Sequence, residues 1–254
     1  SFIFRTFLPH ADKVWLKVVN KWVPLEMTHS DGLFTLEGEN QPSAPCLLKI
    51  EHAGGSYETH DAYSFMPFIT EDELHLFAEG NLNLAYQMLG SHVCELQGVH
   101  GVRFAVWAPS AERVSVVGNF NQWDGRVNPM RVRGASGVWE IFIPNLKAND
   151  LYKFEIRNRH TGAIFSKIDP YSREFELRPG TASRITDATP YQWQDEAWLK
   201  LRGQNDWLHA PFNCYEVHLG SWRRKEGDAP LNFRELADEL ISYVVKMGYT
   251  HIEL

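Results

Sequence analysis

The sequence predicts a mainly β protein: two tandem immunoglobulin-like β-sandwich modules followed by the first β-α-β unit of a truncated (β/α)8 barrel. The sandwich prediction comes from short runs of β-branched and aromatic residues that alternate with turn residues about every ten positions. The barrel prediction comes from residues 214–254, where a strand pattern, a helical pattern and a second strand pattern follow one another.

An internal repeat supports the tandem arrangement. The segment Phe4–Val14 is similar to Arg103–Val114, with a proline, an alanine, an acid, a base and a valine repeated 100 positions later. Further matches keep the same order while the offset grows to 108, as expected for related modules with loop insertions. The matching pairs are Gly32–Phe34 with Gly137–Trp139, Leu48–Glu51 with Phe154–Arg157, and Asp61–Ser64 with Asp169–Ser172. Because Asp61 and Asp169 head equivalent segments, we expect both to build turns rather than to catalyse.

Four segments of the second module have the pattern of β-strands, and turn residues separate them. These segments are Val102–Ala108, Arg113–Gly118, Val138–Ile143 and Tyr152–Asn158. Proline follows the first of them and ends it, because proline cannot donate to a β-ladder.

A capping box at Thr70 and Glu73 predicts a helix that continues to about Glu79, where Gly80 ends it. The segment 81–89, which follows, fits either a second short helix or an extended connector. These residues therefore predict a connector that is at least partly helical.

The end of the chain has a different pattern. Asn232 and Glu235 form a second capping box, apolar residues follow at helical spacing, and Gly248 occupies the position of a C-terminal helix cap. Strands are expected over Cys214–Leu219 and Thr250–Leu254. This strand-helix-strand order is that of a parallel α/β unit.

These patterns predict five parts. They are an N-terminal β-sandwich module over 1–69, a helical connector over 70–90, a second β-sandwich module over 91–192, a linker over 193–213, and the start of a barrel over 214–254. Both chain ends interrupt apolar runs, so we expect a piece of a longer protein.

Composition excludes several classes of function. The net charge of −7 and the absence of a long basic run argue against a nucleic-acid partner. No apolar stretch approaches the roughly 18 residues of a membrane helix, so no membrane partner is expected. An odd number of cysteines without a CxxC motif predicts free thiols in a cytoplasmic protein. No metal-ligand spacing and no phosphate-binding glycine motif is found, so no metal and no cofactor is predicted.

The best candidate for binding is the turn Gly118–Gly125, in which Trp123 is accompanied by amide side chains such as that of Asn121. An indole can stack on the apolar face of a sugar ring while amides bond to its hydroxyl groups. Lys153 lies on the strand face opposite Tyr152 and could donate to sugar oxygens. The alternatives are that Trp123 packs on its own module and that Lys153 is a solvated surface residue.

Several long motifs resemble those of bacterial 1,4-α-glucan (glycogen) branching enzymes. The segment Tyr215–Arg224, YEVHLGSWRR, resembles the first strand of their catalytic barrel, and Gly101–Arg131 resembles their carbohydrate-binding module of family 48. The segment Glu73–His92 resembles the connector between their N-terminal modules. The resemblance covers almost the whole chain.

This resemblance implies a transglycosylase that cleaves an α-1,4 bond and transfers the glucan segment to a 6-hydroxyl group. The catalytic residues of such enzymes belong to later barrel strands, downstream of residue 254. The residues that correspond to their glucan-binding signature are Trp123 and Lys153, and a second aromatic contact falls near Phe165, which also fits a core position. The implied partner is an α-1,4-glucan, bound by a monomer.

Two other readings remain open at this point. A non-catalytic glycogen-targeting protein could use the same module as an anchor, although it would not need the start of a barrel. A related debranching hydrolase could also carry such a module, although the YEVHLGSWRR motif favours a branching enzyme.

Overall fold

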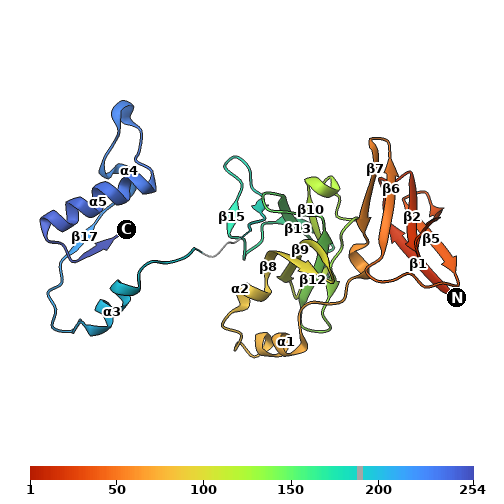
Figure 1. The fold of residues 1–254 in the computed structure, drawn as a ribbon, viewed down its shortest axis with the longest axis horizontal. Helices are drawn as coiled ribbons and strands as arrows, with labels where there is room; N and C mark the ends of the chain where they lie inside the picture. The colour runs from red at the N-terminus through yellow and green to blue at the C-terminus, as the bar shows by residue number, and fades with distance from the viewer. Residues whose placement is uncertain (188–190) are drawn as a thin grey trace. The chain divides into compact units, whose positions relative to one another are not determined.

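The computed structural model describes residues 1–187 and 191–254, which divide into two compact units, Ser1–Thr189 and Pro190–Leu254 (Figure 1). The first unit contains two β-sandwich modules, coloured red to orange and yellow to green, and the second contains a small parallel sheet. The mainly β fold with tandem sandwiches and one β-α-β unit is therefore confirmed. None of the helices in the described ranges combines the length and the apolar character needed to cross a membrane.

The N-terminal module consists of a three-stranded and a four-stranded antiparallel sheet. The first has the order β1-β5-β4 and the second β3-β2-β6-β7. The strands are β1 (Phe2–Phe7), β2 (Lys13–Val18), β3 (Lys21–Pro24), β4 (Glu26–His29), β5 (Leu33–Gly38), β6 (Leu47–His52) and β7 (Gly55–His60). Alternate residues of β2 and β6 are buried together with Phe34 of the facing sheet, which forms one core.

The second module has the same two-sheet construction. One sheet has the order β11-β12-β9-β8, and the other has the order β10-β13-β16-β15 with β14 paired to β13. The strands are β8 (Gly90–Leu96), β9 (Val99–Trp107), β10 (Ala111–Gly118), β11 (Arg131–Val132), β12 (Val138–Pro144), β13 (Leu151–Asn158), β14 (Ile164–Lys167), β15 (Glu174–Phe175) and β16 (Ser183–Arg184). The four strands predicted from the sequence are confirmed to within three residues at each end.

Strand register confirms the internal repeat. Leu16 pairs with Leu48 in the N-terminal module, and Val116 pairs with Phe154 in the second module, so matched residues have matched partners. A turn contact is repeated as well. The backbone N–H groups of Leu8 and Ala108 donate to the carbonyl oxygens of Gly32 and Gly137, each at 2.8 Å.

Asp61 and Asp169 build equivalent turns after the last matched strands. In both turns the carbonyl oxygen of the aspartate accepts from a serine N–H group, Ser64 or Ser172, at 3.1 Å. The Asp169 carboxylate also accepts from the Tyr152 hydroxyl at 2.6 Å. Burial raises the pKa of both carboxyl groups, and that of Asp61 rises to about 6.

The connector between the modules contains α1 (Glu71–Ala78) and α2 (Ala85–Met88). The predicted capping box at Thr70 is present. The segment 81–89, which the sequence allowed to be either helical or extended, contains the short helix α2. Both helices pack on the outer face of the β8-β9-β12 sheet through apolar side chains such as Leu74 and Met88.

A buried ion pair fastens the connector to this sheet. Glu140 of β12 accepts from the Ile69 N–H group at 3.1 Å and lies 3.3 Å from the guanidinium of Arg133. Arg133 also donates to the Ile69 carbonyl oxygen and, at 2.8 Å, to Glu71 in the first turn of α1. Because Glu140 is fully buried, removing Arg133 would leave the Glu140 carboxylate uncompensated.

The second unit is a β-α-β unit. Strands β17 (Cys214–Glu216) and β18 (His251–Glu253) pair in parallel, and α5 (Phe233–Met247) connects them. Helix α5 begins at the predicted Asn232 capping box and ends at Gly248, which has a left-handed conformation (φ 79°).

One local expectation differs from the structure. Strand β17 ends at Glu216 instead of Leu219, because the His218 carbonyl accepts from the Ser221 N–H group at 3.1 Å and starts the short helix α4 (Leu219–Trp222). Within the stretch expected to be a linker, Glu196–Gln204 forms α3. The remaining short elements are the 3₁₀ turns η1 (Ala62–Ser64), η2 (Asn119–Asn121) and η3 (Glu226–Asp228).

Replacing Asp61 with Asn tests the cost of burying this carboxylate. The folded-state pKa of about 6 lies above the ordinary value of 3.8, so the stabilisation that the protonated form provides is lost as the pH rises between these values. Relative to the parent, Asp61→Asn is expected to gain about 1–3 kcal/mol of unfolding free energy at pH 7.5 and little at pH 4, measured by urea unfolding.

The exposed Asp12 provides the control, because Asp12→Asn removes a solvated carboxylate and should change stability equally at both pH values. An Asp61→Asn variant destabilised to the same extent at pH 4 and pH 7.5 would contradict the burial argument.

Candidate functional site

The candidate binding turn is closed by backbone hydrogen bonds at the end of β10. The N–H group of Trp123 donates to the Gly118 carbonyl oxygen at 2.9 Å, and Gly118 pairs with Tyr152 of β13. This contact brings Trp123 back to the strand pair from which the turn begins. The candidate turn therefore lies beside the strand that carries Lys153.

Trp123 has an unusual backbone conformation. Its φ angle is 60° and that of Gln122 is 57°, a left-handed region that bulky side chains rarely adopt. Backbone strain of this kind is concentrated at functional sites. The indole is 39% exposed, and its Nε1 donates to Asn119 Oδ1 at 2.7 Å, which fixes the orientation of the ring. The turn thus presents an oriented, accessible aromatic ring.

Asn121 has a different position from Trp123. It is buried, its Oδ1 accepts from the Gly118 N–H group at 2.9 Å, and its Nδ2 donates to the Val116 carbonyl at 2.8 Å and to Asn128 Oδ1 at 2.9 Å. Both polar atoms of the Asn121 amide are therefore already hydrogen-bonded within the protein. Asn121 therefore holds the turn in shape, and direct contact with a sugar would require breaking them.

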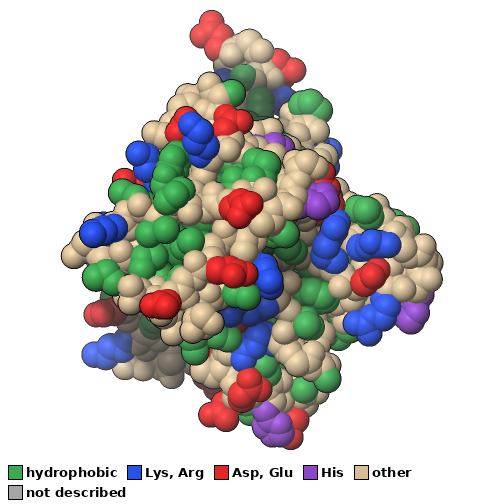
Figure 2. Space-filling view, turned by 90° about the vertical axis from the view of Figure 1, so that its right-hand side faces the viewer, with side chains coloured by type: hydrophobic (Ala, Val, Ile, Leu, Met, Phe, Trp, Pro, Cys, Tyr) green, Lys and Arg blue, Asp and Glu red, His purple; other side chains and the backbone are tan. Residues whose placement is uncertain are grey.

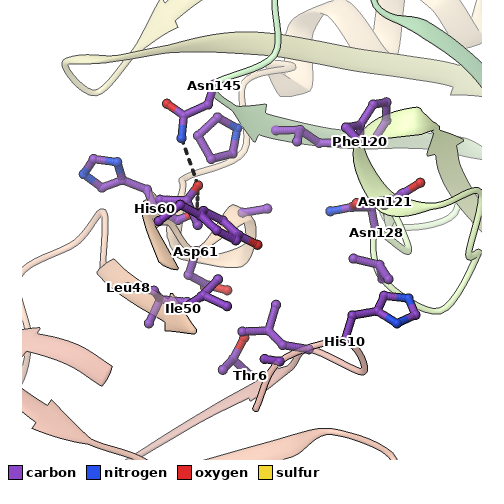
Figure 3. A pocket seen from close by; sticks show the side chains of 18 of the residues that line it. Thr6, His10, Leu48, Ile50, His60, Asp61, Phe120, Asn121, Asn128 and Asn145 are labelled. Carbon is purple, nitrogen blue, oxygen red and sulfur yellow. Dashed lines mark hydrogen bonds between the residues drawn. The ribbon is translucent and has the colours of Figure 1, made fainter. Parts of the chain in front are cut away.

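Asn121 also lines a cavity of about 500 Å³ inside the first unit (Figure 3). Figure 3 shows Phe120, Asn121 and Asn128 on one side of the cavity, and His60 and Asp61 of the N-terminal part on the opposite side. A hydrogen bond joins the two modules at this cavity: Asn145 Nδ2, after β12, donates to Thr59 Oγ1 of β7 at 3.1 Å. The turn thus has one side toward this cavity, while Trp123 is among the exposed aromatic residues.

Lys153 lies on the outer face of the β10–β13 pair. Its neighbours Tyr152 and Phe154 are buried in the core, so alternation places Lys153 on the opposite face, as predicted. The Lys153 ammonium donates to Thr181 Oγ1 at 2.6 Å. Sequence reasoning missed Thr181, because the 28 residues between the two positions leave no local signal.

Other residues attach the turn to the same face. Glu155 lies two positions from Lys153 and pairs with Arg113 at 2.5 Å. A Cβ atom at Gly125 would lie 2.0 Å from Glu155 Oε1, so a larger residue here would require the Glu155 carboxylate to move. A hydrogen bond from Arg126 is the main cause of the lowered pKa of Asp124, which therefore stays ionised in the turn.

The structure does not bring Phe165 to this face. Phe165 of β14 pairs with Ile156, and paired residues of antiparallel strands share a face, so its side chain lies on the side of Phe154. Ile164 pairs with Arg157 and shares the face of Lys153, with 57% of its surface exposed. Lys153 thus lies on the outer face of β13, and Phe165, although 44% exposed, projects from the other face.

No group of three or more His, Cys, Asp or Glu residues that could hold a metal ion occurs in residues 1–187 and 191–254. Within the same ranges Cys46, Cys94 and Cys214 are free thiols, and burial is the main cause of the raised pKa of Cys46 and Cys94. Neither observation adds a reactive centre to the Trp123 surface.

Replacing Asn121 with Ala tests its structural role. The change leaves the buried Gly118 N–H and Val116 carbonyl groups without their partner, so the unfolding free energy is expected to fall by about 1–3 kcal/mol in urea unfolding. Gln122→Asn is the control, because Gln122 is exposed and Asn tolerates a positive φ. Equal stability of Asn121→Ala and the parent would refute the role.

Comparison with known proteins gives matches over the whole chain. Residues 88–172 match Carbohydrate-binding module 48 (Isoamylase N-terminal domain). The chain is 58% identical over 254 residues to the 1,4-alpha-glucan branching enzyme GlgB of Methylobacillus flagellatus, covering 100% of this chain and 35% of that protein. It is 55% identical over 259 residues to the enzyme of the same name from Cellvibrio japonicus, covering 99% of this chain and 35% of that protein.

Among solved structures, apo pullulanase from Klebsiella pneumoniae aligns with 98% of this chain and 31% of its own, at 15% identity and a TM-score of 0.46. The chain spans about a third of the length of the curated relatives it matches. The resemblance drawn from the sequence is confirmed over the full length of the chain. Over its whole length the chain is therefore similar to a part of the 1,4-alpha-glucan branching enzymes GlgB, and residues 88–172 match carbohydrate-binding module family 48.

Proposed function

We propose that this chain supplies glucan binding to a 1,4-α-glucan branching enzyme, a transglycosylase of glycogen synthesis that cleaves α-1,4 bonds and re-attaches the segment through α-1,6 bonds. The observation that carries the proposal is the oriented and exposed indole of Trp123, in a turn that begins at Gly118 beside the strand of Lys153. The ligand is an α-1,4-glucan such as glycogen or a maltooligosaccharide.

The chemistry of this surface suits a sugar chain. The apolar face of a pyranose ring stacks on the Trp123 indole, whose amphipathic ring gives both contact area and a polar edge. Lys153 and Thr181, already joined by a hydrogen bond, supply a donor and an acceptor for hydroxyl groups. One stacked ring with a few hydrogen bonds corresponds to a Kd on the order of 0.1–1 mM, or about 4–5.5 kcal/mol.

We further propose the division into an N-terminal module over 1–69, a connector over 70–90, a glucan-binding module over 91–192, a linker over 193–213 and the start of a barrel over 214–254. The N-cap of α1 at Thr70 and the start of β8 at Gly90 support the first two boundaries. The parent enzyme is proposed to act in the cytoplasm as a monomer, without a metal or cofactor.

Trp123→Ala is expected to weaken glucan binding at least fivefold, because it removes the stacking ring and leaves the strands unchanged. Retardation in native gels that contain glycogen measures the binding, and circular dichroism checks the fold. Trp198→Ala is the matched control, since Trp198 is a 53% exposed indole on α3, outside the module. Equal retardation of Trp123→Ala and the parent would place the site elsewhere.

Residues 1–254 alone are expected to form no α-1,6 bonds. Two paired strands are described in the second unit, whereas a (β/α)8 barrel builds its active site from the ends of several of its eight strands. Incubation with amylose, followed by an assay for α-1,6 linkages, should give the background value. Turnover above background would overturn this part of the proposal.

A further inference from the structure

The outer face of the β3-β2-β6-β7 sheet in the N-terminal module carries two tryptophans. Val14 and Leu16 of β2 are buried, so alternation places Trp15 and Lys17 on the opposite, outer face. Lys17 pairs with Trp22 of β3, which therefore lies on the same outer face. We call this surface, formed by Trp15, Lys17, Trp22 and Lys49, the Trp15–Trp22 face.

A lysine accompanies each indole of this face. The Lys17 ammonium lies 5.7 Å from the ring centroid of Trp22, and the Lys49 ammonium lies 5.5 Å from that of Trp15. Lys49 also pairs with Trp15 across the β2–β6 ladder. Trp15 and Trp22 are both half-buried and are diagonal neighbours, which are close enough for one oligosaccharide to cross both rings.

The repeat relates this face to the surface proposed to bind glucan. Leu16 pairs with Leu48 as Val116 pairs with Phe154, so the outer faces of the β2–β6 and β10–β13 pairs are equivalent. In the second module the turn 119–125 follows β10 and carries Trp123. In the N-terminal module β3 follows β2 and carries Trp22. Each module thus has an indole directly after the equivalent strand.

We propose that the Trp15–Trp22 face is a second α-glucan-binding surface, distinct from the one at Trp123. This inference rests on the proposed function, because the glucan ligand is taken from the neighbouring module. The two indoles stack on consecutive parts of a glucan chain, and Lys17 and Lys49 turn from the rings to donate to hydroxyl groups. Figure 2 views the molecule from the side of the N-terminal module and shows basic, acidic and hydrophobic side chains interspersed on it.

The test uses the whole chain with Trp123→Ala, so that the first surface is weakened while Trp15 and Trp22 stay intact. Maltoheptaose is titrated into the ¹⁵N-labelled protein, and the indole N–H signals are assigned by single replacements. The signals of Trp15 and Trp22 are expected to shift with saturation in the millimolar range, while that of Trp198 stays unchanged. Unmoved Trp15 and Trp22 signals would overturn the inference.

Binding to glycogen gives a second readout. Adding Trp22→Ala to Trp123→Ala is expected to reduce the remaining gel retardation at least threefold. Adding Lys17→Gln and Lys49→Gln instead, which leaves both indoles in place, is expected to reduce it about twofold. Lys200→Gln with Lys246→Gln, which removes two exposed lysines on α3 and α5, is the charge-matched control and should have no effect. Thermal unfolding by circular dichroism checks each fold.

The outcomes separate this inference from the proposed function. If the parent is retarded, Trp123→Ala loses all retardation and the Trp15 and Trp22 signals stay fixed, the proposed function stands and the second surface is refuted. If retardation persists in Trp123→Ala and is lost with Trp22→Ala, the second surface is supported. A parent chain that glycogen does not retard, with no indole shift, would refute both.

Discussion

The antiparallel pairing of β10 with β13 is the constraint on which the proposed glucan-binding surface depends. It places Val116 against Phe154 in the core and leaves Lys153 outside, at the end where Gly118 begins the Trp123 turn. Because side chains alternate along a strand, a slip of one residue would bury Lys153 and expose the aromatic core. The pairing of β2 with β6 imposes the same rule on the N-terminal module, where it exposes Trp15 and Lys49.

Much of this arrangement could be predicted from the sequence, because the relevant signals are local. Alternation placed Lys153 opposite Tyr152, the capping boxes placed the starts of α1 and α5, and the order of repeated segments indicated two related modules. Turn chemistry singled out the segment 118–125 in the same way. In each case residues close together in the chain determine the local structure, so no knowledge of the tertiary fold was needed.

What the sequence did not predict depends on contacts between distant segments. The face on which Phe165 lies is set by the register of β14 on β13, and a shift of one position exchanges it with Ile164. The role of Asn121 depends on Asn128 and Val116, since an amide in a turn has the same sequence pattern whether it is solvated or buried. Trp22 had no distinguishing motif, and only the strand pairing places it beside Lys17.

The buried pair of Glu140 and Arg133 affects how the two proposed surfaces would bind a glucan polymer. By fastening the connector to the β8-β9-β12 sheet, it prevents the segment between the modules from acting as a free tether. Two weak surfaces at a fixed separation bind with avidity only when one ligand molecule reaches both. The effective concentration of the ligand at the second surface depends on the distance between the two surfaces. Such a chain would select for particles that display many glucan branches at the right spacing, and would hold a single short oligosaccharide no more tightly than one surface does.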